Sequence, residues 1–183
     1  MRHISPIQRM EQTALAVRLI KLDARLQLLE AELCLSRGIL LIMYREIRGE
    51  SPPKGMLPFA DEWYFTWQPC IHSSLFMAYH QFYESSRELS PLECLIRAYE
   101  KYIQEISRRR NYIEGGPVVS ITRAWMMLKK MSGRGRSLQL TTCIQCGGDF
   151  VTSVGLPSKS FVCSLCHLPA RAGKTNRANG RYL

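Results

Sequence analysis

Two pairs of cysteines near the end of the chain constrain its fold more than any other feature. They are Cys143-Ile144-Gln145-Cys146 and Cys163-Ser164-Leu165-Cys166, and sixteen residues lie between Cys146 and Cys163. Each C-x-x-C turn can present two thiolates on one side, and two such turns complete a tetrahedron around one zinc ion, with Zn–S distances of about 2.3 Å. The spacing therefore predicts one Zn²⁺ per chain, held by Cys143, Cys146, Cys163 and Cys166.

The residues between the two pairs have the composition of a small hairpin. Gly147 and Gly148 allow the backbone to reverse after the first pair, because glycine accepts a positive φ without steric cost. We expect strands at 149–152 and 160–162, joined by a turn at 154–158, with 138–140 as a third strand. The predicted product is a small four-cysteine, zinc-ribbon-like module.

A site closed by four thiolates is structural, since it leaves no coordination position open for a water or a substrate. Its role is to fold a segment that is too short to bury an adequate core. The rest of the chain contains no paired-carboxylate site, G-x-S-x-G, P-loop or G-x-G-x-x-G pattern. We therefore predict that the protein is not an enzyme.

A rival interpretation of the second pair is covalent haem attachment, because Cys163 to His167 also spells C-x-x-C-H. That chemistry requires export, and the polar stretch 1–12 has no signal peptide. Haem also leaves Cys143 and Cys146 without a role. His167 is an alternative ligand to Cys166, although we favour a position beside the site.

The absence of an export signal predicts a cytoplasmic protein, and no apolar run approaches the length of a membrane span. In that compartment thiols stay reduced. The three isolated cysteines, Cys34, Cys70 and Cys94, lie among apolar residues, so we expect them to be small buried side chains.

Positive charge is concentrated at the metal-binding end. The chain of 183 residues carries a net charge of +10, and residues 133–183 hold seven Lys/Arg and one acid, which is +6. A basic module favours a polyanion such as DNA, whereas the plain alternative is a soluble basic surface. The candidate DNA contacts are Arg37, Arg45, Arg48, Arg134, Arg136, Lys159, Arg171 and Lys174.

The N-terminal part is predicted to be helical. Ser5-Pro6 is a helix start, and a leucine repeat at heptad spacing predicts one long helix over 6–35. This helix packs either inside a bundle or on another subunit. A second helix, capped by Ser36 and ended by Gly49, gives 15–48 the outline of a helix-turn-helix. The repeated leucines are Leu15, Leu19, Leu22, Leu26, Leu29 and Leu33.

The remaining chain completes a mainly α fold. Prolines make 50–59 a stiff connection, and helices are expected at 69–87, 91–107 and 117–131. A flexible basic linker follows at 132–136. We predict a multi-helix, partner-binding domain over 1–132, the zinc-binding module over 133–168 and a basic, flexible tail over 169–183.

Several segments taken together resemble the FlhC family, the zinc-containing subunit of the bacterial flagellar master activator. They are Ala24-Arg25-Leu26-Gln27, Leu35-Ser36-Arg37-Gly38, Pro52-Pro53-Lys54-Gly55-Met56-Leu57-Pro58-Phe59, Leu95-Ile96-Arg97-Ala98-Tyr99, Thr122-Arg123-Ala124-Trp125 and the span from Cys143 to Cys166. The resemblance covers nearly the full length. It implies a mostly helical subunit whose metal ligands are the four cysteines named above.

The resemblance also implies partners. Members pair with FlhD in a heterohexamer of four FlhD and two FlhC chains, bind promoter DNA upstream of flagellar and some non-flagellar operons, and recruit RNA polymerase. Two features depart from the family: the basic tail is shorter than in some members, and His167 follows the last cysteine. We therefore predict a DNA-binding transcription activator subunit. The alternative is a zinc-ribbon adaptor that binds another protein and makes no direct DNA contact.

Overall fold

The computed structural model describes residues 5–108, 116–170 and 172, and within them the fold is mainly α, as predicted. Six α-helices are followed by one two-stranded sheet, and two short 3₁₀ helices, η1 (Glu62–Phe65) and η2 (Ser158–Ser160), complete the described elements. The α-helices are α1 (Pro6–Lys21), α2 (Leu26–Glu32), α3 (Arg37–Arg48), α4 (Trp67–Ser85), α5 (Pro91–Ser107) and α6 (Ile121–Met131).

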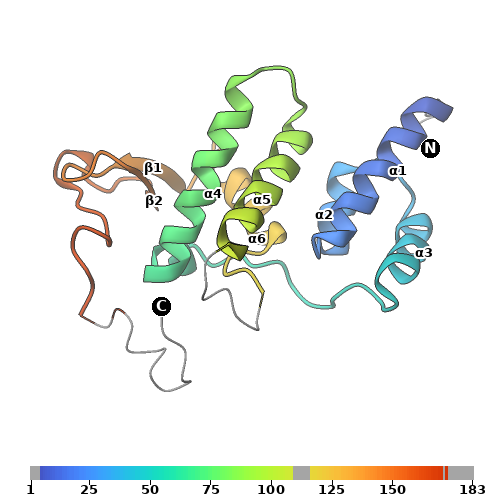
Figure 1. The fold of residues 1–183 in the computed structure, drawn as a ribbon, viewed down its shortest axis with the longest axis horizontal. Coiled ribbons are helices and arrows are strands. Elements are labelled where there is room, and N and C mark those ends of the chain that lie inside the picture. The colour runs from blue at the N-terminus through green and yellow to red at the C-terminus, as the bar shows by residue number, and fades with distance from the viewer. Residues whose placement is uncertain (1–4, 109–115, 171, 173–183) are drawn as a thin grey trace. The chain divides into compact units, whose positions relative to one another are not determined.

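The chain divides into two compact units, whose elements can be followed in Figure 1. Unit 1 comprises residues 1–59 and 120–125, and unit 2 comprises 60–119 and 126–183. Helix α6 therefore begins in unit 1 and ends in unit 2. The division into domains at 132 and 168 stays a prediction, and most of the predicted tail lies outside the described residues.

In unit 1, the start of α1 is as predicted, but the single helix over 6–35 is wrong. The Oγ of Ser5 accepts the N–H of Gln8, and the Gln8 side chain accepts the N–H of Ser5, which closes a capping box. The helix ends at Lys21 because Asp23 adopts the left-handed conformation, with φ of 63°. Asp tolerates this conformation better than most residues with a side chain.

The break lets the leucine repeat pack inside unit 1. Leu19, Leu26, Leu29 and Leu33 are all buried within the chain itself. These four leucines therefore pack inside the chain, as in the first of the two alternatives, and not on another subunit. Helix α3 follows the prediction closely: the Ser36 Oγ accepts the N–H of Ile39, and Gly49 ends the helix with φ of 72°.

Three of the segments that carry the family resemblance meet at the start of α2. The guanidinium of Arg25 donates to the carbonyl of Met56, and the Gln27 amide donates to the carbonyl of Gly55. The backbone N–H of Arg25 donates to the Thr122 Oγ1 at 3.1 Å. Segments 24–27, 52–59 and 122–125 therefore form one contact, which fastens the proline-rich connection to unit 1.

In unit 2, α4 and α5 lie side by side and supply most of the helical core (Figure 1). Helix α5 begins as predicted, because the Ser90 Oγ accepts the N–H of Glu93 and Pro91 occupies the first turn. The hydroxyl of Tyr99 donates to the carbonyl of Val119 at 2.9 Å, so the chain before α6 is held against α5. Helix α6 starts four residues later than predicted, with Ser120 as its cap.

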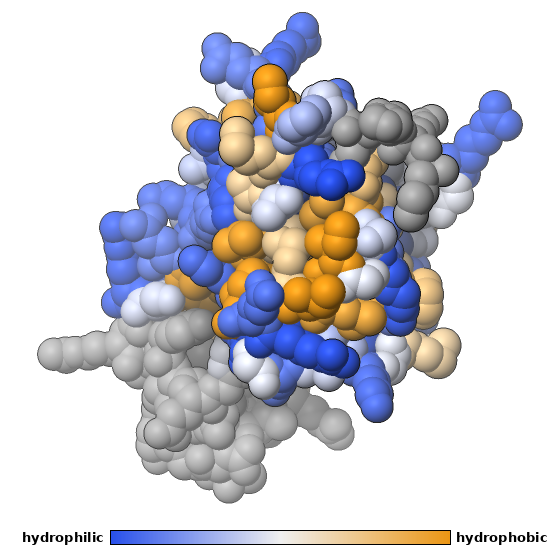
Figure 2. Space-filling view, turned by 90° about the vertical axis from the view of Figure 1, so that its right-hand side faces the viewer, coloured by the Kyte–Doolittle hydropathy of each residue, from blue (hydrophilic) through white to orange (hydrophobic). Residues whose placement is uncertain are grey.

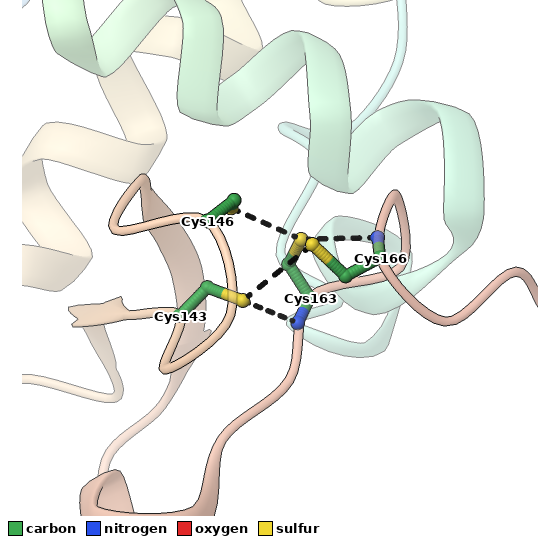
Figure 3. A group of neighbouring side chains, drawn as sticks. All are labelled: Cys143, Cys146, Cys163 and Cys166. Atoms are coloured by element: carbon green, nitrogen blue, oxygen red, sulfur yellow. Dashed lines mark hydrogen bonds between the residues drawn. The ribbon is translucent and has the colours of Figure 1, made fainter.

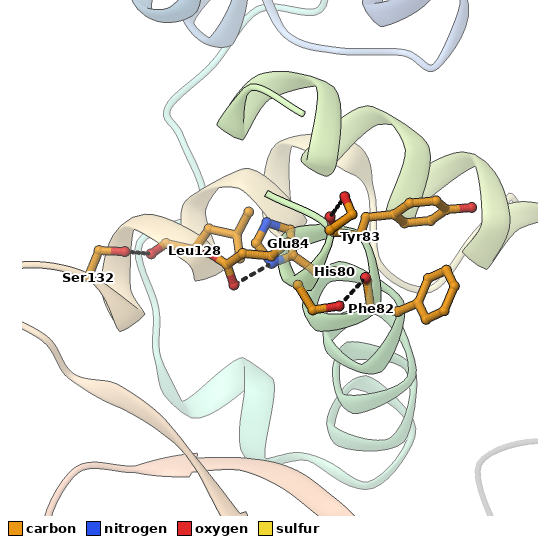
Figure 4. A network of polar contacts seen from close by, with 8 residues as sticks. His80, Phe82, Tyr83, Glu84, Leu128 and Ser132 are labelled. Carbon is orange, nitrogen blue, oxygen red and sulfur yellow. Dashed lines mark hydrogen bonds and ion pairs between the residues drawn. The ribbon is translucent and has the colours of Figure 1, made fainter. Parts of the chain in front are cut away.

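The predicted flexible linker over 132–136 is a closed turn. The N–H of Ser137 donates to the carbonyl of Lys130 at 2.9 Å, and the Ser132 hydroxyl donates to the carbonyl of Leu128 (Figure 4). Gly133 takes a φ of 80°, which the reversal requires. Lys130 also pairs with Asp61. The first strand of the sheet thus leaves α6 from a fixed point.

Within the described residues, no helix combines the length and the apolar character that a membrane span requires.

His80 on α4 is a buried titratable group of unit 2 whose Nδ1 has no hydrogen bond among the described residues. Its exposure is 7%, its ring lies 6.0 Å from that of Phe76, and its Nδ1 is 3.8 Å from the Glu84 carboxylate (Figure 4). No hydrogen bond to this Nδ1 is found among the described residues. Burial lowers the pKa of His80, and the Glu84 carboxylate opposes this only in part.

Because the folded state disfavours protonated His80, its contribution to stability is present above an unfolded pKa of about 6.5 and is lost as the pH falls through the folded pKa. We expect the unfolding free energy of wild type to fall between pH 7 and 5 more steeply than that of His80→Gln, by up to about 1.4 kcal/mol per pH unit. Urea unfolding at several pH values measures this, with the exposed His167→Gln as control. Equal slopes for wild type and His80→Gln would contradict the assignment.

Candidate metal centre

The first cysteine pair is carried by an antiparallel hairpin of β1 (Leu138–Thr142) and β2 (Asp149–Ser153), and the second pair lies on the chain that follows η2. Leu138 pairs with Ser153 at one end and Thr142 with Asp149 at the other. The first cysteine pair forms the loop between the strands. There the N–H of Cys143 donates to the carbonyl of Gly148, and Gly147 takes a φ of 70°. The glycines reverse the chain as predicted.

The predicted strand pairing is wrong, because 160–162 does not pair with 149–152. The partner of β2 is β1, and residues 158–160 form η2. The outer edge of β2, where another strand would add, is occupied by α4. The N–H of Val151 donates to the Ser74 Oγ at 3.0 Å, and its carbonyl accepts from the Cys70 Sγ at 3.6 Å.

The four predicted ligands come together in one group (Figure 3), and their sulfur atoms all lie within 4.8 Å of one another. The Sγ atoms of Cys143 and Cys166 are 3.9 Å apart, and those of Cys146 and Cys163 are 3.7 Å apart. A tetrahedron with metal–sulfur distances of about 2.3 Å has edges of about 3.8 Å. The donor set and its spacing therefore fit one tetrahedral metal ion.

Backbone N–H groups point at the sulfur atoms and favour thiolates. The N–H of Cys163 donates to the Cys143 Sγ at 3.3 Å, and that of Cys166 donates to the Cys163 Sγ at 3.4 Å. Burial alone would raise the pKa of Cys143, but the N–H groups of Cys163, Cys146 and Gln145 outweigh it and lower the pKa to about 6.

The pKa values of the Cys146 and Cys166 thiols are raised, so these two groups resist ionisation when no cation is present. The neighbouring Cys163 thiol, with burial and the remaining sulfurs, raises the pKa of Cys166 to about 12. Four thiolates within 4.8 Å cannot coexist without a cation, because like charges at this distance strongly disfavour the ionised form. A dication removes this conflict, so the geometry is that of a ligand set rather than of four free thiols.

The metal centre is built onto α4. Cys70 of that helix packs in one buried cluster with Cys143, Phe150 and Cys163, and Phe161 and Val162 close the cluster from the second cysteine arm. The sequence does not reveal Cys70 and Ser74 as neighbours of the site. The only signal was the apolar setting of Cys70, which indicates burial and not the element against which it is buried.

The remaining cysteines and His167 have mixed outcomes. Cys70 and Cys94 are buried as predicted, but Cys34 is exposed. Cys34 lies in extended chain between the buried Leu33 and Leu35, and alternate side chains of extended chain point to opposite sides. His167 is exposed beside the site and is not one of the four grouped ligands, while its N–H donates to the carbonyl of Cys163.

The predicted DNA contacts fall in both units. In unit 1, Arg37 pairs with Glu30 and Arg48 pairs with Asp23, so both share their charge with an acid. Arg45 is exposed, and no ion pair to it is found in the described part of the chain.

In unit 2, the three basic candidates of the metal-binding module are Arg134, Arg136 and Lys159. All three are exposed, and none has an ion pair within residues 5–108, 116–170 and 172. Arg171 and Lys174 lie outside the described residues. Every described DNA-contact candidate of the metal-binding module is therefore a cation without an ion pair among the described residues.

Comparison with known proteins identifies the family of this chain. The family model described as "Flagellar transcriptional activator (FlhC)" matches residues 1–179. The chain belongs to the FlhC family. A flagellar transcriptional regulator FlhC from Gallionella capsiferriformans (strain ES-2) is 47% identical over 94% of this chain and 92% of that protein. FlhC regulators from Paraburkholderia atlantica and Serratia marcescens are 44% and 41% identical, over 91% and 94% of this chain and 74% and 87% of theirs.

Membership in the FlhC family supports a role as transcriptional activator of flagellar genes. The likeness spans both units and the metal-binding module, because the matched residues begin at residue 1 and run beyond Cys166. The four grouped cysteines therefore lie inside the region that this FlhC-family chain shares with the family.

Replacing one ligand should empty the site. We expect Cys166→Ser to retain only a small fraction of the metal that wild type binds, because a hydroxyl is a poor substitute for a thiolate and three ligands hold the ion weakly. Elemental analysis of the purified protein after dialysis measures this. Cys34→Ser, at an exposed thiol outside the group, should keep full metal. Full metal occupancy in Cys166→Ser would remove that residue from the ligand set.

The attachment of β2 to α4 can be tested separately. In Ser74→Ala the buried N–H of Val151 loses its acceptor, so we expect a loss of about 1–3 kcal/mol in unfolding free energy. The control is Ser85→Ala on the same helix, whose hydroxyl is exposed and bonds only to the preceding turn. Chemical denaturation measures both variants. A Ser74→Ala protein as stable as the control would show that this bond does not hold the hairpin.

Proposed function

We propose that this chain is a DNA-binding activator subunit that works with FlhD on promoters of flagellar and some non-flagellar operons in the cytoplasm. Two copies assemble with four FlhD chains, the complex binds double-stranded promoter DNA, and it recruits RNA polymerase. The proposal extends the family membership, which supports activation of flagellar genes. It includes no enzymatic step, in line with relatives named as transcriptional regulators.

The proposed metal is zinc, one ion per chain. Four thiolates at tetrahedral positions are typical ligands of zinc or of an iron–sulfur centre. The sulfur–sulfur distances of about 3.8 Å are those expected around a single ion, which favours zinc. Once closed by Cys143, Cys146, Cys163 and Cys166, the site has no open position, so the ion cross-links the hairpin and the second cysteine arm and takes no part in chemistry. A colourless protein with one zinc per chain is the expected preparation.

Unit 1 is the proposed contact for the partner subunit. Figure 2 shows apolar side chains gathered on one face of the molecule. Among the large exposed apolar residues, Ile7 and Met10 lie on α1, and Ile39 and Ile42 lie on α3. Exposed apolar side chains in this number are typical of a protein interface, and an acid, Glu46, is exposed on α3 beside the candidate Arg45. These features favour a protein over a phosphate backbone at this surface.

The observation that carries the DNA-binding proposal is the set of unpaired cations on the metal-binding module. Arg134 and Arg136 precede β1, and Lys159 lies on η2. Because none is paired among the described residues, phosphate contacts can form without first breaking an ion pair. Each contact releases counterions from DNA and so makes affinity depend on salt.

The test is a salt titration of promoter binding by the complex with FlhD. Replacing Arg134, Arg136 and Lys159 with Gln should weaken binding and reduce the slope of log K against log salt by about 0.9 for each lost phosphate contact. The matched control replaces two bases of α5, Arg97 and Lys101, and its C-terminal cap residue Arg108 with Gln, which changes the net charge equally. We expect the control to keep the wild-type slope.

Two outcomes would count against the proposal. If the slope of the module variant equals that of wild type, these three side chains do not contact phosphates. If wild type itself binds promoter DNA with no salt dependence, or does not bind it, the adaptor alternative replaces the DNA-binding function.

A further inference from the structure

The two ends of the metal-binding hairpin differ in chemistry. The end at Leu138 and Ser153 is continuous with the basic turn that contains Arg134 and Arg136. The other end, about 13 Å away along five-residue strands, carries the cysteine loops. The second cysteine arm is held at that end, because the N–H of Ile144 donates to the carbonyl of Phe161 at 3.0 Å.

We call segments 143–148 and 161–170, at the cysteine end, the knuckle face; it borders the exposed Asp149, whose carboxylate accepts a hydrogen bond from the Thr142 hydroxyl. Segments 143–148 and 161–170 contain no Lys, Arg, Asp or Glu, although the chain as a whole has a net charge of +10. A surface with this composition is a poor match for a phosphate backbone, because it offers no cation to release counterions.

Aliphatic side chains are exposed on the knuckle face. Ile144 is 61% exposed, Leu165 is 52% exposed and Leu168 is 61% exposed. Ile144 follows Cys143 and Leu165 precedes Cys166, and the sulfur atoms of those two cysteines are only 3.9 Å apart. Ile144 and Leu165 are therefore each adjacent in sequence to one of two cysteines whose sulfur atoms lie close together. A rigid site that has no Lys, Arg, Asp or Glu in its loops and exposes three aliphatic side chains is typical of a protein contact.

The size of this surface restricts its occupant. Three aliphatic side chains supply an apolar surface area on the order of a few hundred Å², whereas a stable specific interface buries about 800 Å² of surface area on each partner. The knuckle face is too small to hold a permanent subunit or a second copy of the chain by itself. It suffices for a protein bound to the same DNA, because tethering raises the effective concentration to about millimolar and a weak contact is then occupied.

We propose that the knuckle face docks an apolar, weakly charged surface of a protein held on the same DNA, and that this protein is RNA polymerase. The inference rests on the proposed function, which supplies the DNA and the polymerase. It assigns different ends of one hairpin to the two tasks: the basic end binds phosphates, and the knuckle face contacts the polymerase.

The experiment separates activation from binding. Ile144→Ser/Leu165→Ser removes both aliphatic groups without changing charge. The control is Val154→Ser/Leu156→Ser, which changes two aliphatic residues that are 39% and 40% exposed in the turn at the opposite end of the hairpin. For each complex with FlhD we measure metal content, assembly, promoter affinity and the yield of transcript from purified RNA polymerase holoenzyme.

We expect the knuckle variant to keep metal, assembly and promoter affinity within about twofold of wild type and to lose about tenfold in transcript yield, while the control stays active. Full transcript yield from the knuckle variant would overturn the inference. Loss of assembly would assign this surface to a permanent subunit, and a parallel fall in promoter affinity would assign it to DNA, so either result overturns it too.

If the serine pair loses its metal, the milder pair Ile144→Thr/Leu165→Gln is measured against the same criteria. Measurements on the wild-type complex separate a failure of the proposed function from a failure of the knuckle-face assignment. If wild type binds no promoter or gives no activation, the proposed function fails. If wild type activates and both knuckle variants activate equally well, only the knuckle-face assignment fails.

Discussion

The structure of unit 2 depends on how α4 holds the outer edge of β2. A hairpin of two five-residue strands has too little core to be stable alone. Here the Ser74 hydroxyl accepts the N–H of Val151, and Cys70 packs in the cluster that contains Cys143 and Cys163. The metal ligands therefore share a core with a 19-residue helix. Zinc binding energy that orders the cysteine arms would also order the hairpin against α4, which gives the small module a fixed orientation within unit 2.

That fixed orientation is what a charge-based DNA contact requires. Arg134 and Arg136 leave α6 through a closed turn and enter β1 directly. Long basic side chains lose conformational entropy on binding, so the cost falls when their backbone is already ordered. In unit 1, by contrast, Arg37 and Arg48 already pair with acids, and contact with phosphate would exchange one partner for another. The metal-binding module is thus the better-prepared cationic surface among the described residues.

Local features of the sequence were predictable because they depend on neighbouring residues. The ligand spacing placed four sulfurs that do come together, and the caps at Ser5, Ser36 and Ser90 started helices as predicted. The errors have non-local causes. The strand partner of β2 could not be predicted, because the outer edge is taken by side chains of α4, 77 residues away in sequence from Val151. The helix break at Asp23 was missed because a leucine repeat at heptad spacing continues across it, while the chain turns to bury Leu26 and Leu29.

The separation of charge from apolar surface on one hairpin follows from its metal centre. Backbone N–H groups contact the sulfur atoms of the cysteine loops, and a metal ion held by the four cysteines would order these loops without charged side chains. Residues between the ligands are then free to be apolar and exposed, as Ile144 and Leu165 are. A loop of the same length without a metal would have to bury such residues to stay ordered. A metal ion in this site would therefore allow a small module to present a rigid aliphatic surface at one end of the hairpin, while Arg134 and Arg136 lie at the other end. The proposed contacts with DNA and with a protein on that DNA require this arrangement.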